Sequence, residues 1–239
     1  MDGDLADCKG LVHLKQKYGA LLCLDEAHAT GVFGANGGGV AEAQGVAEEV
    51  DVHVGTLSKA IGSHGGFVGC SAQLKRLLLT KGRAGVYSTA LPLPAVAAAS
   101  AALRLCTPER RAQLWQRVDT FASAIGVTAT SPIIPIIVGS EEAALGAAED
   151  LLHQGFLVPA IRPPTVPPGT ARLRVALSAE HEPDVLDALA GSLKTLSDAA
   201  SASAIFDQAK KERQRAKASG FARGNTRGDR RTRPPETRQ

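Results

Sequence analysis

A lysine and an aspartate, each following a short apolar run, are the residues of this 239-residue chain best suited to chemistry. Asp25 ends the apolar run 21–24, and Lys59 ends the stretch 54–59 (VGTLSK), thirty-four residues after the aspartate. A lysine amine can form a Schiff base with a carbonyl compound, and an aspartate can hold a protonated ring nitrogen. Pyridoxal phosphate (PLP) requires both groups to act as an electron sink, so the pair predicts a PLP site.

The residues around this pair allow two interpretations each. Lys59 alone is equally compatible with a solvated surface lysine, and Asp25 alone with a cap at a strand end. His28 is either a hydrogen-bond partner for the phenolic oxygen of PLP or a loop histidine. Thr56 and Ser58 either bind phosphate or shape a turn. The combination is far more specific than any one of its members, and it favours the cofactor site.

Arginine residues in the last third of the chain indicate a carboxylate site. Guanidinium groups bind carboxylates in a two-pronged fashion, so Arg162 and Arg174 are candidates to hold a substrate carboxylate. Arg172 and Arg174 alternate with apolar residues, which predicts a half-exposed strand with both arginines on its polar face. A solvated sheet face is the alternative. The proline-rich loop 162–169 either places Thr165 against a substrate or serves as a spacer.

Hydrophobic periodicity and turn residues divide the chain into helices and strands. Helices are predicted over residues 5–18, 71–82, 94–106, 109–124, 141–154 and 182–196. Strands are predicted over residues 21–24, 50–55, 65–70, 86–89, 133–138, 155–158 and 172–177. Their order indicates an α/β domain over residues 1–125, a small α+β domain over 126–200 and a basic tail over 201–239.

Several of these elements carry expectations about burial and ends. Residues 21–24 are continuously apolar, as in a strand covered on both faces. Three leucines of helix 71–82 are expected to face inward: Leu74, Leu77 and Leu78. The alanine-rich helix 94–106 is expected to be buried. Gly19 should end the first helix, and Pro135 should place its strand at a sheet edge.

Charge is spread unevenly along the chain. Residues 207–239 carry 11 Lys/Arg and 4 Asp/Glu, whereas the rest carries 16 Lys/Arg and 20 Asp/Glu. The last twenty or so residues are predicted to be disordered, because they are polar and rich in Arg, Gly and Thr. The stretch 230–233 (RRTR) permits electrostatic binding to nucleic acid. Phe206 and Phe221 are the only aromatic residues of the tail, so stacking is limited and this function is not favoured.

The cysteines and the apolar runs bear on compartment. The four cysteines are Cys8, Cys23, Cys70 and Cys106. They lack CxxC spacing, so no metal site is expected. Cys23 and Cys70 lie in apolar runs and are expected to be buried thiols, as in a reducing compartment. No run reaches the roughly 18–20 apolar residues of a membrane span, and the acidic start is unlike a signal or transit peptide.

Four stretches together resemble the α-oxoamine synthases, which are fold-type I PLP-dependent transferases. They are residues 24–31 (LDEAHATG), 55–59 (GTLSK), 87–89 (YST) and 160–169 (AIRPPTVPPG). The resemblance covers about residues 1–196. It implies the C-terminal part of the fold-type I architecture, a partial mixed sheet with helices, followed by a small α+β domain.

The resemblance also implies roles for residues near the cofactor. Lys59 would be the Schiff-base lysine, and Asp25 would pair with the pyridinium nitrogen of PLP. His28 would bond to the phenolic oxygen, and Thr56, with Ser58 beside it, would contact the cofactor. Family members are homodimers with sites at the interface, so Thr89 would reach the phosphate in the partner subunit.

The loop with the sequence RPPTVP most resembles that of family members in biotin biosynthesis. Residues 37–42 and 64–67 of this chain resemble the plant and algal forms of those members. This resemblance implies decarboxylative condensation of L-alanine with a pimeloyl thioester, carried by CoA or by a carrier protein. Thr165 would lie at the substrate, and Arg174, together with Arg162, at a carboxylate. The alternatives are a glycine acyltransferase, an aminolevulinate synthase, or a non-catalytic dimerisation partner that binds no PLP.

Chains of this family extend well upstream of residue 1. Their upstream part holds a glycine-rich phosphate loop, an aromatic residue stacked on the cofactor ring and further substrate contacts. We therefore expect a fragment, a truncated gene model or a degenerate paralogue, with exposed sheet edges. The family resemblance implies a cytosolic or peroxisomal protein, although residues 237–239 (TRQ) do not form a peroxisomal signal.

Overall fold

A computed structural model of the chain describes residues 1–196. The chain divides into two compact units, Met1–Ala190 and Gly191–Gln239, and the first unit holds both sheets and the helices from α1 to α7. The disorder and the nucleic-acid binding considered for the basic tail concern residues outside the described range. The domain boundaries expected at residues 125 and 200 stay predictions. Within the described residues, no helix is both long and apolar enough to cross a membrane.

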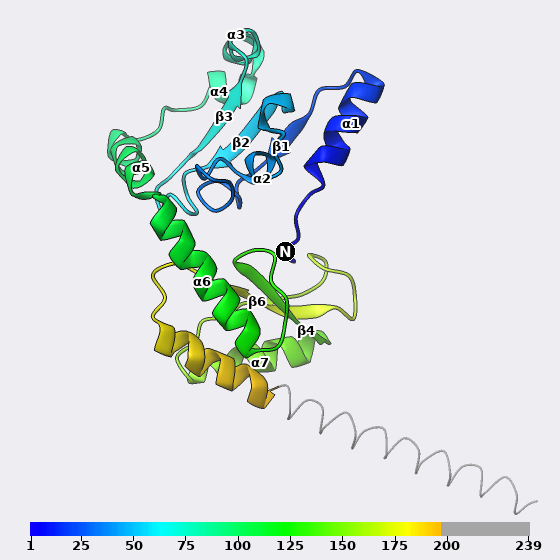
Figure 1. The fold of residues 1–239 in the computed structure, drawn as a ribbon, viewed down its shortest axis with the longest axis vertical. Coiled ribbons are helices and arrows are strands. Elements are labelled where there is room, and N and C mark those ends of the chain that lie inside the picture. Colours follow the sequence, from blue (N-terminus) through cyan, green and yellow to red (C-terminus); the bar gives the residue numbers. More distant parts are fainter. Residues whose placement is uncertain (197–239) are drawn as a thin grey trace, which may run out of the picture. The chain divides into compact units, whose positions relative to one another are not determined.

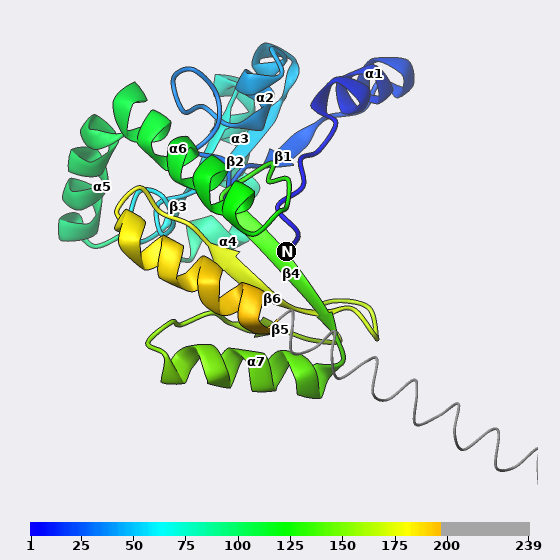
Figure 2. The same cartoon turned by 60° about the horizontal axis from the view of Figure 1, so that its bottom comes forward.

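Helices and strands alternate along the described chain (Figures 1 and 2). In the first half they are α1 (Cys8–Tyr18), β1 (Cys23–Asp25), α2 (Val40–Ala43), η1 (Ala47–Glu49), β2 (Val52–Thr56), β3 (Gly66–Cys70), α3 (Ala72–Lys81) and α4 (Arg83–Val86). They continue with α5 (Leu93–Leu105), α6 (Pro108–Ala124), β4 (Ile133–Gly139), α7 (Glu141–His153), β5 (Ala160–Ile161) and β6 (Ala171–Ala176). Residues 183–196 are also helical.

The first sheet has the strand order β1-β2-β3. β1 pairs with β2 in parallel, with Asp25 opposite Val54, and β3 pairs with β2 in the antiparallel direction. Carboxyl ends of parallel strands meet at one edge of a sheet, so Asp25 and the turn that follows Thr56 lie at the same edge. This arrangement carries the two motifs that the sequence singled out.

The first helix shows how local sequence sets the element ends. The side chain of Asp7 accepts a hydrogen bond from Gly10 N at 2.9 Å, which caps the helix and starts it three residues later than predicted. Gly19 ends it, as predicted, in the left-handed conformation with φ of 61°. Cys8 and Val12 on its inner face pack into the core cluster that also holds residues of β1 and α2.

Burial in β1 corrects one expectation. Leu22 and Leu24 are buried, whereas Leu21 and Cys23 are exposed. Within the described residues this strand is therefore covered on one face only, and its burial alternates with the period of two that one-sided packing gives. The buried thiol is Cys8, and Cys23 is not buried.

The two apolar helices α3 and α5 correct another expectation. Both form close to the predicted bounds, and Ser71 caps α3 by accepting from Leu74 N at 3.2 Å. Leu77 and Leu78 are nevertheless exposed, and Ala99 is the one buried residue of α5. Periodicity defines an apolar stripe, but burial requires an element packed against it, and in residues 1–196 these stripes meet solvent.

The second sheet has the order β4-β6-β5. Pro135 lies on the edge strand β4, as predicted. An edge strand has no neighbour on its outer side, so a residue without an N–H is tolerated there. β6 is the central strand. The prediction of a half-exposed strand is wrong, because five of its residues in a row are not exposed on either face: Arg172 is 5% exposed and Leu173 is buried. Residues 155–158 are not a strand, since β5 is limited to Ala160–Ile161.

The predicted strand 86–89 is also wrong. Residues 83–86 form the short helix α4, and Tyr87 closes it by donating its backbone N–H to Arg83 O at 3.1 Å. Gly82 N likewise bonds to Leu78 O at 2.8 Å, so the chain passes from α3 into α4 through successive helical turns. These i→i−4 hydrogen bonds are those of a helix. The β-branched Val86 favoured an extended segment in the sequence, but it does not prevent a helical turn.

Two adjacent leucines of α7 test the packing of the second sheet. Leu151 is 0% exposed and Leu152 is 55% exposed. Both lie in α7, so Leu→Ala makes the same change in helix propensity at the two positions. We expect Leu151→Ala to lower the free energy of unfolding by about 2–5 kcal/mol, because it removes buried methyl groups and leaves a cavity. Leu152→Ala should change it by less than about 0.5 kcal/mol. Urea unfolding measures both, and equal losses would contradict this packing.

Candidate active site

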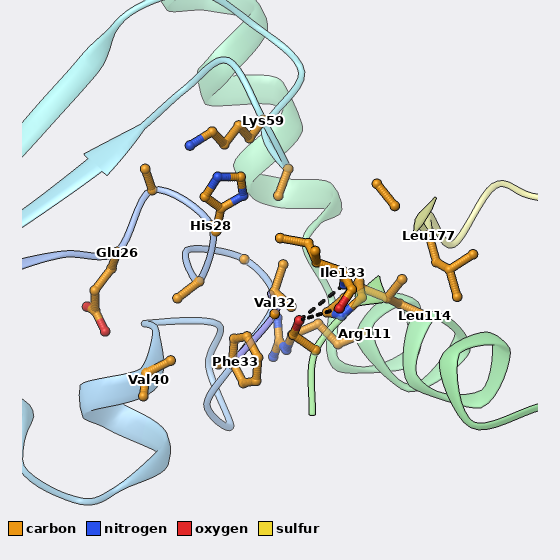
Figure 3. Close-up of a pocket in the computed structure, with 18 of the residues that line it drawn as sticks. Glu26, His28, Val32, Phe33, Val40, Lys59, Arg111, Leu114, Ile133 and Leu177 are labelled. Atoms are coloured by element: carbon orange, nitrogen blue, oxygen red, sulfur yellow. Dashed lines mark hydrogen bonds between the residues drawn. The ribbon is translucent and has the colours of Figure 1, made fainter. Parts of the chain in front are cut away.

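A cavity of about 1080 Å³ lies where β1 and β2 end. Asp25 lines it from the end of β1 and His28 from the turn that follows. Lys59 lines it from the turn after β2, and Arg174 lines it from β6. Figure 3 shows the Lys59 side chain beside the His28 ring. The fold thus brings together four of the predicted site residues, from segments far apart in the sequence.

The turn that carries Lys59 is held by its own hydrogen bonds. Thr56 Oγ1 is 2.8 Å from Ser58 Oγ and donates to Gly65 O at 3.1 Å. Ser63 N donates to Leu57 O at 2.7 Å across the same loop. Thr56 and Ser58 therefore shape the turn, and neither lines the cavity in this structure. Their assignment to the phosphate of a cofactor stays a prediction.

The charged groups of the cavity act on the pKa of His28. Burial lowers the pKa of His28, and the positive charges of Lys59 and Arg174 lower it further, while the Asp25 carboxylate acts in the opposite direction. The amine, the guanidinium and the carboxylate line the same cavity as this imidazole. Asp25 also accepts a hydrogen bond from Ala27 N at 2.9 Å, which orients its carboxylate.

Arg174 carries an unmatched hydrogen-bond donor. Its Nε is buried without a hydrogen-bond partner among the described residues, while its backbone N–H donates to Pro159 O at 3.0 Å. A buried donor left without a partner costs free energy, so an anionic ligand would stabilise this side chain. An amine, a carboxylate and an arginine with a free donor around one cavity form a donor set that fits PLP and an amino-acid carboxylate.

Three predicted site residues lie elsewhere. Arg162 and Thr165 belong to the loop after β5, and Thr165 lines a second, shallow hollow together with the prolines of that loop. Thr89 is exposed between α4 and α5. The described chain does not bring these three residues to the main cavity. Their roles toward substrate and partner subunit stay predictions.

Two buried charged residues that line the cavity were missed by sequence reasoning. Arg111 donates from Nη1 to Cys106 O at 2.8 Å and from Nη2 to Ala35 O. The second bond joins α6 to the glycine-rich loop of residues 29–39. Nothing in its helical pattern distinguishes it from the neighbouring arginine. Glu26 could have been found from the sequence. Residues two apart on a strand share a face, and Glu26 follows Leu22 and Leu24 at that spacing, on the buried side.

The comparisons with known proteins identify the family of the chain. The model of the class I and II aminotransferase family matches residues 1–193, and the chain belongs to that family. The resemblance and the fold class predicted from the motifs are confirmed: the chain has the mixed α/β architecture of fold-type I PLP enzymes.

Relatives of known identity are 8-amino-7-oxononanoate synthases. The chain is 50% identical over 200 residues to that of Arabidopsis thaliana, covering 83% of this chain and 42% of the relative. It is 48% identical over 201 residues to that of Anaeromyxobacter dehalogenans, covering 81% of this chain and 50% of the relative. The chain therefore spans about half the length of the curated relatives it matches.

Solved structures give the same picture. Serine palmitoyltransferase of Sphingomonas wittichii superposes with a TM-score of 0.80 at 32% identity, covering 84% of this chain and 53% of that one. The 8-amino-7-oxononanoate synthase of Francisella tularensis superposes with a TM-score of 0.71 at 25% identity, covering 85% and 61%. Another serine palmitoyltransferase structure, with a TM-score of 0.78 and 33% identity over 83% of this chain and 52% of its own, contains PLP.

The lowered pKa of His28 gives a testable consequence. Because the pKa is lower in the folded chain than in the unfolded one, the folded chain binds fewer protons between the two values. The free energy of unfolding should therefore fall as the pH drops through the ordinary histidine pKa toward the lower folded value. We expect Lys59→Met to raise the pKa of His28 only part of the way, since burial is the larger cause.

An NMR titration of the His28 ring protons measures this shift. Lys15→Met is the matched control, because Lys15 pairs with Asp51 at 2.8 Å and does not act on His28. If Lys59→Met and Lys15→Met give the same His28 pKa, the amine does not lie beside the imidazole.

Proposed function

We propose that this chain carries the cofactor-binding lysine, aspartate and histidine of an 8-amino-7-oxononanoate synthase. The reaction is the decarboxylative condensation of L-alanine with a pimeloyl thioester, which yields 8-amino-7-oxononanoate, CO₂ and the free thiol. The observation that carries the proposal is the meeting of Asp25, His28 and Lys59 in one cavity at the ends of two parallel strands. The 50% identity to the Arabidopsis enzyme supports the choice of reaction.

The cofactor implied by this reaction is PLP, which when bound supplies an electron sink for negative charge at the substrate Cα. Lys59 would hold its aldehyde carbon through Nζ. The amine of Lys59 would also be placed to remove or return a proton at the substrate Cα. Asp25 would keep the proton on the ring nitrogen, since a carboxylate beside a pyridinium favours the charged form.

His28 contributes in its neutral form. Its pKa is lowered by burial and by the neighbouring cations, so the imidazole carries no charge at neutral pH. A neutral imidazole offers one donor and one acceptor, which suits a hydrogen bond to the phenolic oxygen of PLP. A cationic ring at this place would compete with Lys59 for that oxygen and oppose a second positive charge nearby.

Arg174 is suited to the carboxylate of the amino acid. Its buried Nε has no partner among the described residues, and the side chain lines the same cavity as Lys59. A charge-assisted bond to a substrate carboxylate would satisfy that donor. The pimeloyl thioester and a second copy of the chain are proposed as partners on the strength of the named relatives alone.

Labelling of one lysine tests the cofactor assignment. We expect borohydride reduction of the chain mixed with PLP to fix a pyridoxyl group on Lys59, because its amine lies in the cavity beside an acid. Peptide mapping by mass spectrometry locates the label. Lys59→Ala should lose it, and Lys75→Ala, at an exposed position on α3, should keep it. Label spread evenly over several lysines would contradict the assignment and favour a non-catalytic dimerisation partner.

Amino-acid choice tests the reaction. L-Alanine should change the visible absorbance of the PLP-loaded chain, and Arg174→Met should raise the apparent Kd for L-alanine by about tenfold to a hundredfold. The reason is the loss of a charge-assisted hydrogen bond that contributes about 1.5–3 kcal/mol. Arg76→Met, at an exposed position on α3, is the control. A response to glycine alone would favour the glycine acyltransferase or aminolevulinate synthase type.

A further inference from the structure

Glu26 is a buried acid that the proposed reaction leaves without a role. It follows Asp25 directly, yet it is 5% exposed while Asp25 is exposed. Successive residues of an extended segment point to opposite faces, so the two acids lie on different sides of the backbone. A carboxyl group this deeply buried needs hydrogen-bond partners, because its desolvation is otherwise uncompensated.

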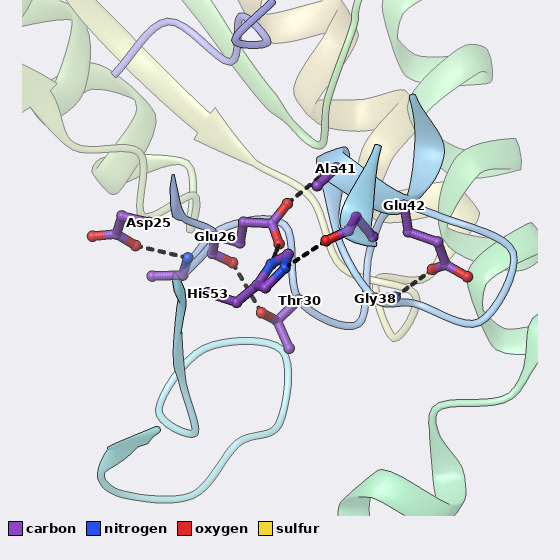
Figure 4. Close-up of polar contacts among 9 residues, drawn as sticks. Asp25, Glu26, Thr30, Gly38, Ala41, Glu42 and His53 are labelled. Atoms are coloured by element: carbon purple, nitrogen blue, oxygen red, sulfur yellow. Dashed lines mark hydrogen bonds and ion pairs between the residues drawn. The ribbon is translucent and has the colours of Figure 1, made fainter. Parts of the chain in front are cut away.

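The carboxyl group of Glu26 has two partners on other elements (Figure 4). Its Oε1 accepts from Ala41 N in α2 at 2.9 Å, and its Oε2 lies 3.1 Å from Nδ1 of His53 in β2. The other ring nitrogen of His53, Nε2, is 3.1 Å from Ala47 O in η1. A carbonyl oxygen only accepts, so the tautomer with a hydrogen on Nε2 fits this contact.

The neighbouring loop is shaped around this carboxyl group. A Cβ on Gly39 would lie 2.5 Å from the carboxyl carbon and both oxygens of Glu26, and Gly39 has φ of 118°. Any other residue there would both strain the backbone and displace the acid. The position of Gly39 therefore allows α2 to begin beside the Glu26 carboxyl.

The main chain of Glu26 is bonded as well. Glu26 N donates to Val54 O at 2.8 Å and continues the β1–β2 ladder by one residue. Glu26 O accepts from Ala29 N at 2.8 Å, from Thr30 N at 2.9 Å and from Thr30 Oγ1 at 3.0 Å. One residue thus joins the end of β1, the turn 27–30 and, through its side chain, the elements α2, β2 and η1.

We propose that the Glu26–His53 pair is a positioning device that holds Asp25 and His28 in the cavity. Asp25 precedes Glu26 and His28 lies two residues after it, so the direction in which both side chains leave the backbone depends on how Glu26 is fixed. What Asp25 and His28 do for a cofactor rests on the proposed function. Their placement is a property of the chain itself, and it can be measured without a cofactor.

The first test measures the pKa of His28 by NMR in the chain without PLP. Glu26→Ala should move it upward toward the ordinary histidine value, because a loosened turn removes what burial the ring has and takes it away from Lys59 and Arg174. Glu26 is not itself a cause of the His28 shift, and simple loss of a negative charge would move the pKa downward. An upward shift therefore reports displacement of the turn. His53→Asn should give the same direction.

A matched control exists on the same loop. Glu42→Ala removes a carboxylate that accepts from Gly38 N at 2.7 Å and from Asn36 Nδ2 at 2.7 Å but does not contact the turn 27–30. It should leave the pKa of His28 unchanged. Glu26→Gln covers the case in which Glu26→Ala fails to fold, because its amide oxygen still accepts from Ala41 N; it should shift the pKa by a smaller amount in the same direction.

The second test measures the Kd for PLP by absorbance titration. Glu26→Ala and His53→Asn should raise it by about tenfold or more, since misplacing Asp25 or His28 would weaken a charge-assisted hydrogen bond that contributes about 1.5–3 kcal/mol. A wild-type chain that takes up no PLP would count against the proposed function, while the His28 titration still decides the positioning role. That role is overturned if the His28 pKa is the same in wild type, Glu26→Ala, Glu26→Gln and His53→Asn, or if Glu42→Ala shifts it equally.

Discussion

The parallel pairing of β1 with β2 is the constraint on which the candidate site depends. It places the end of one strand, at Asp25, next to the turn that carries Lys59, although thirty-four residues separate the two. Parallel neighbours cannot be joined by a tight hairpin, so the connection must travel away and return. The glycine-rich loop, α2 and η1 make that connection, and they also supply the contacts that hold Glu26.

Two adjacent acids take different tasks because the backbone alternates between faces. Asp25 points to the cavity, where its charge acts on His28. Glu26 also lines the cavity but is buried, and Ala41 N and His53 satisfy its oxygens. The chemistry of the side chains is nearly identical, and the environment alone separates the exposed acid from the buried one. Arg174, on the central strand of the second sheet, completes the cavity from a rigid position.

Much of the local structure could be predicted from the sequence, because its causes are local. Helix periodicity gave α6 and α7 within about two residues, as in most amphipathic helices. Gly19 ends α1 since only glycine adopts the left-handed cap at no steric cost, and Pro135 lies on an edge strand since it lacks an N–H. The motifs around Asp25 and Lys59 identified the family, because few chemistries need an acid and an amine in that context.

Burial and pairing were decided by tertiary structure. The apolar stripe of α3 was visible in the sequence, but the exposure of Leu77 depends on what packs against it, which no local pattern contains. Arg172 was expected on the polar face of a half-exposed strand and is buried, where it pairs with Asp2 and bonds to Thr170. The sequence determined which residues could do chemistry. Only the fold decided that Glu26 meets His53 and that Arg174 joins Lys59, because contacts between distant segments follow from packing, not from spacing along the chain.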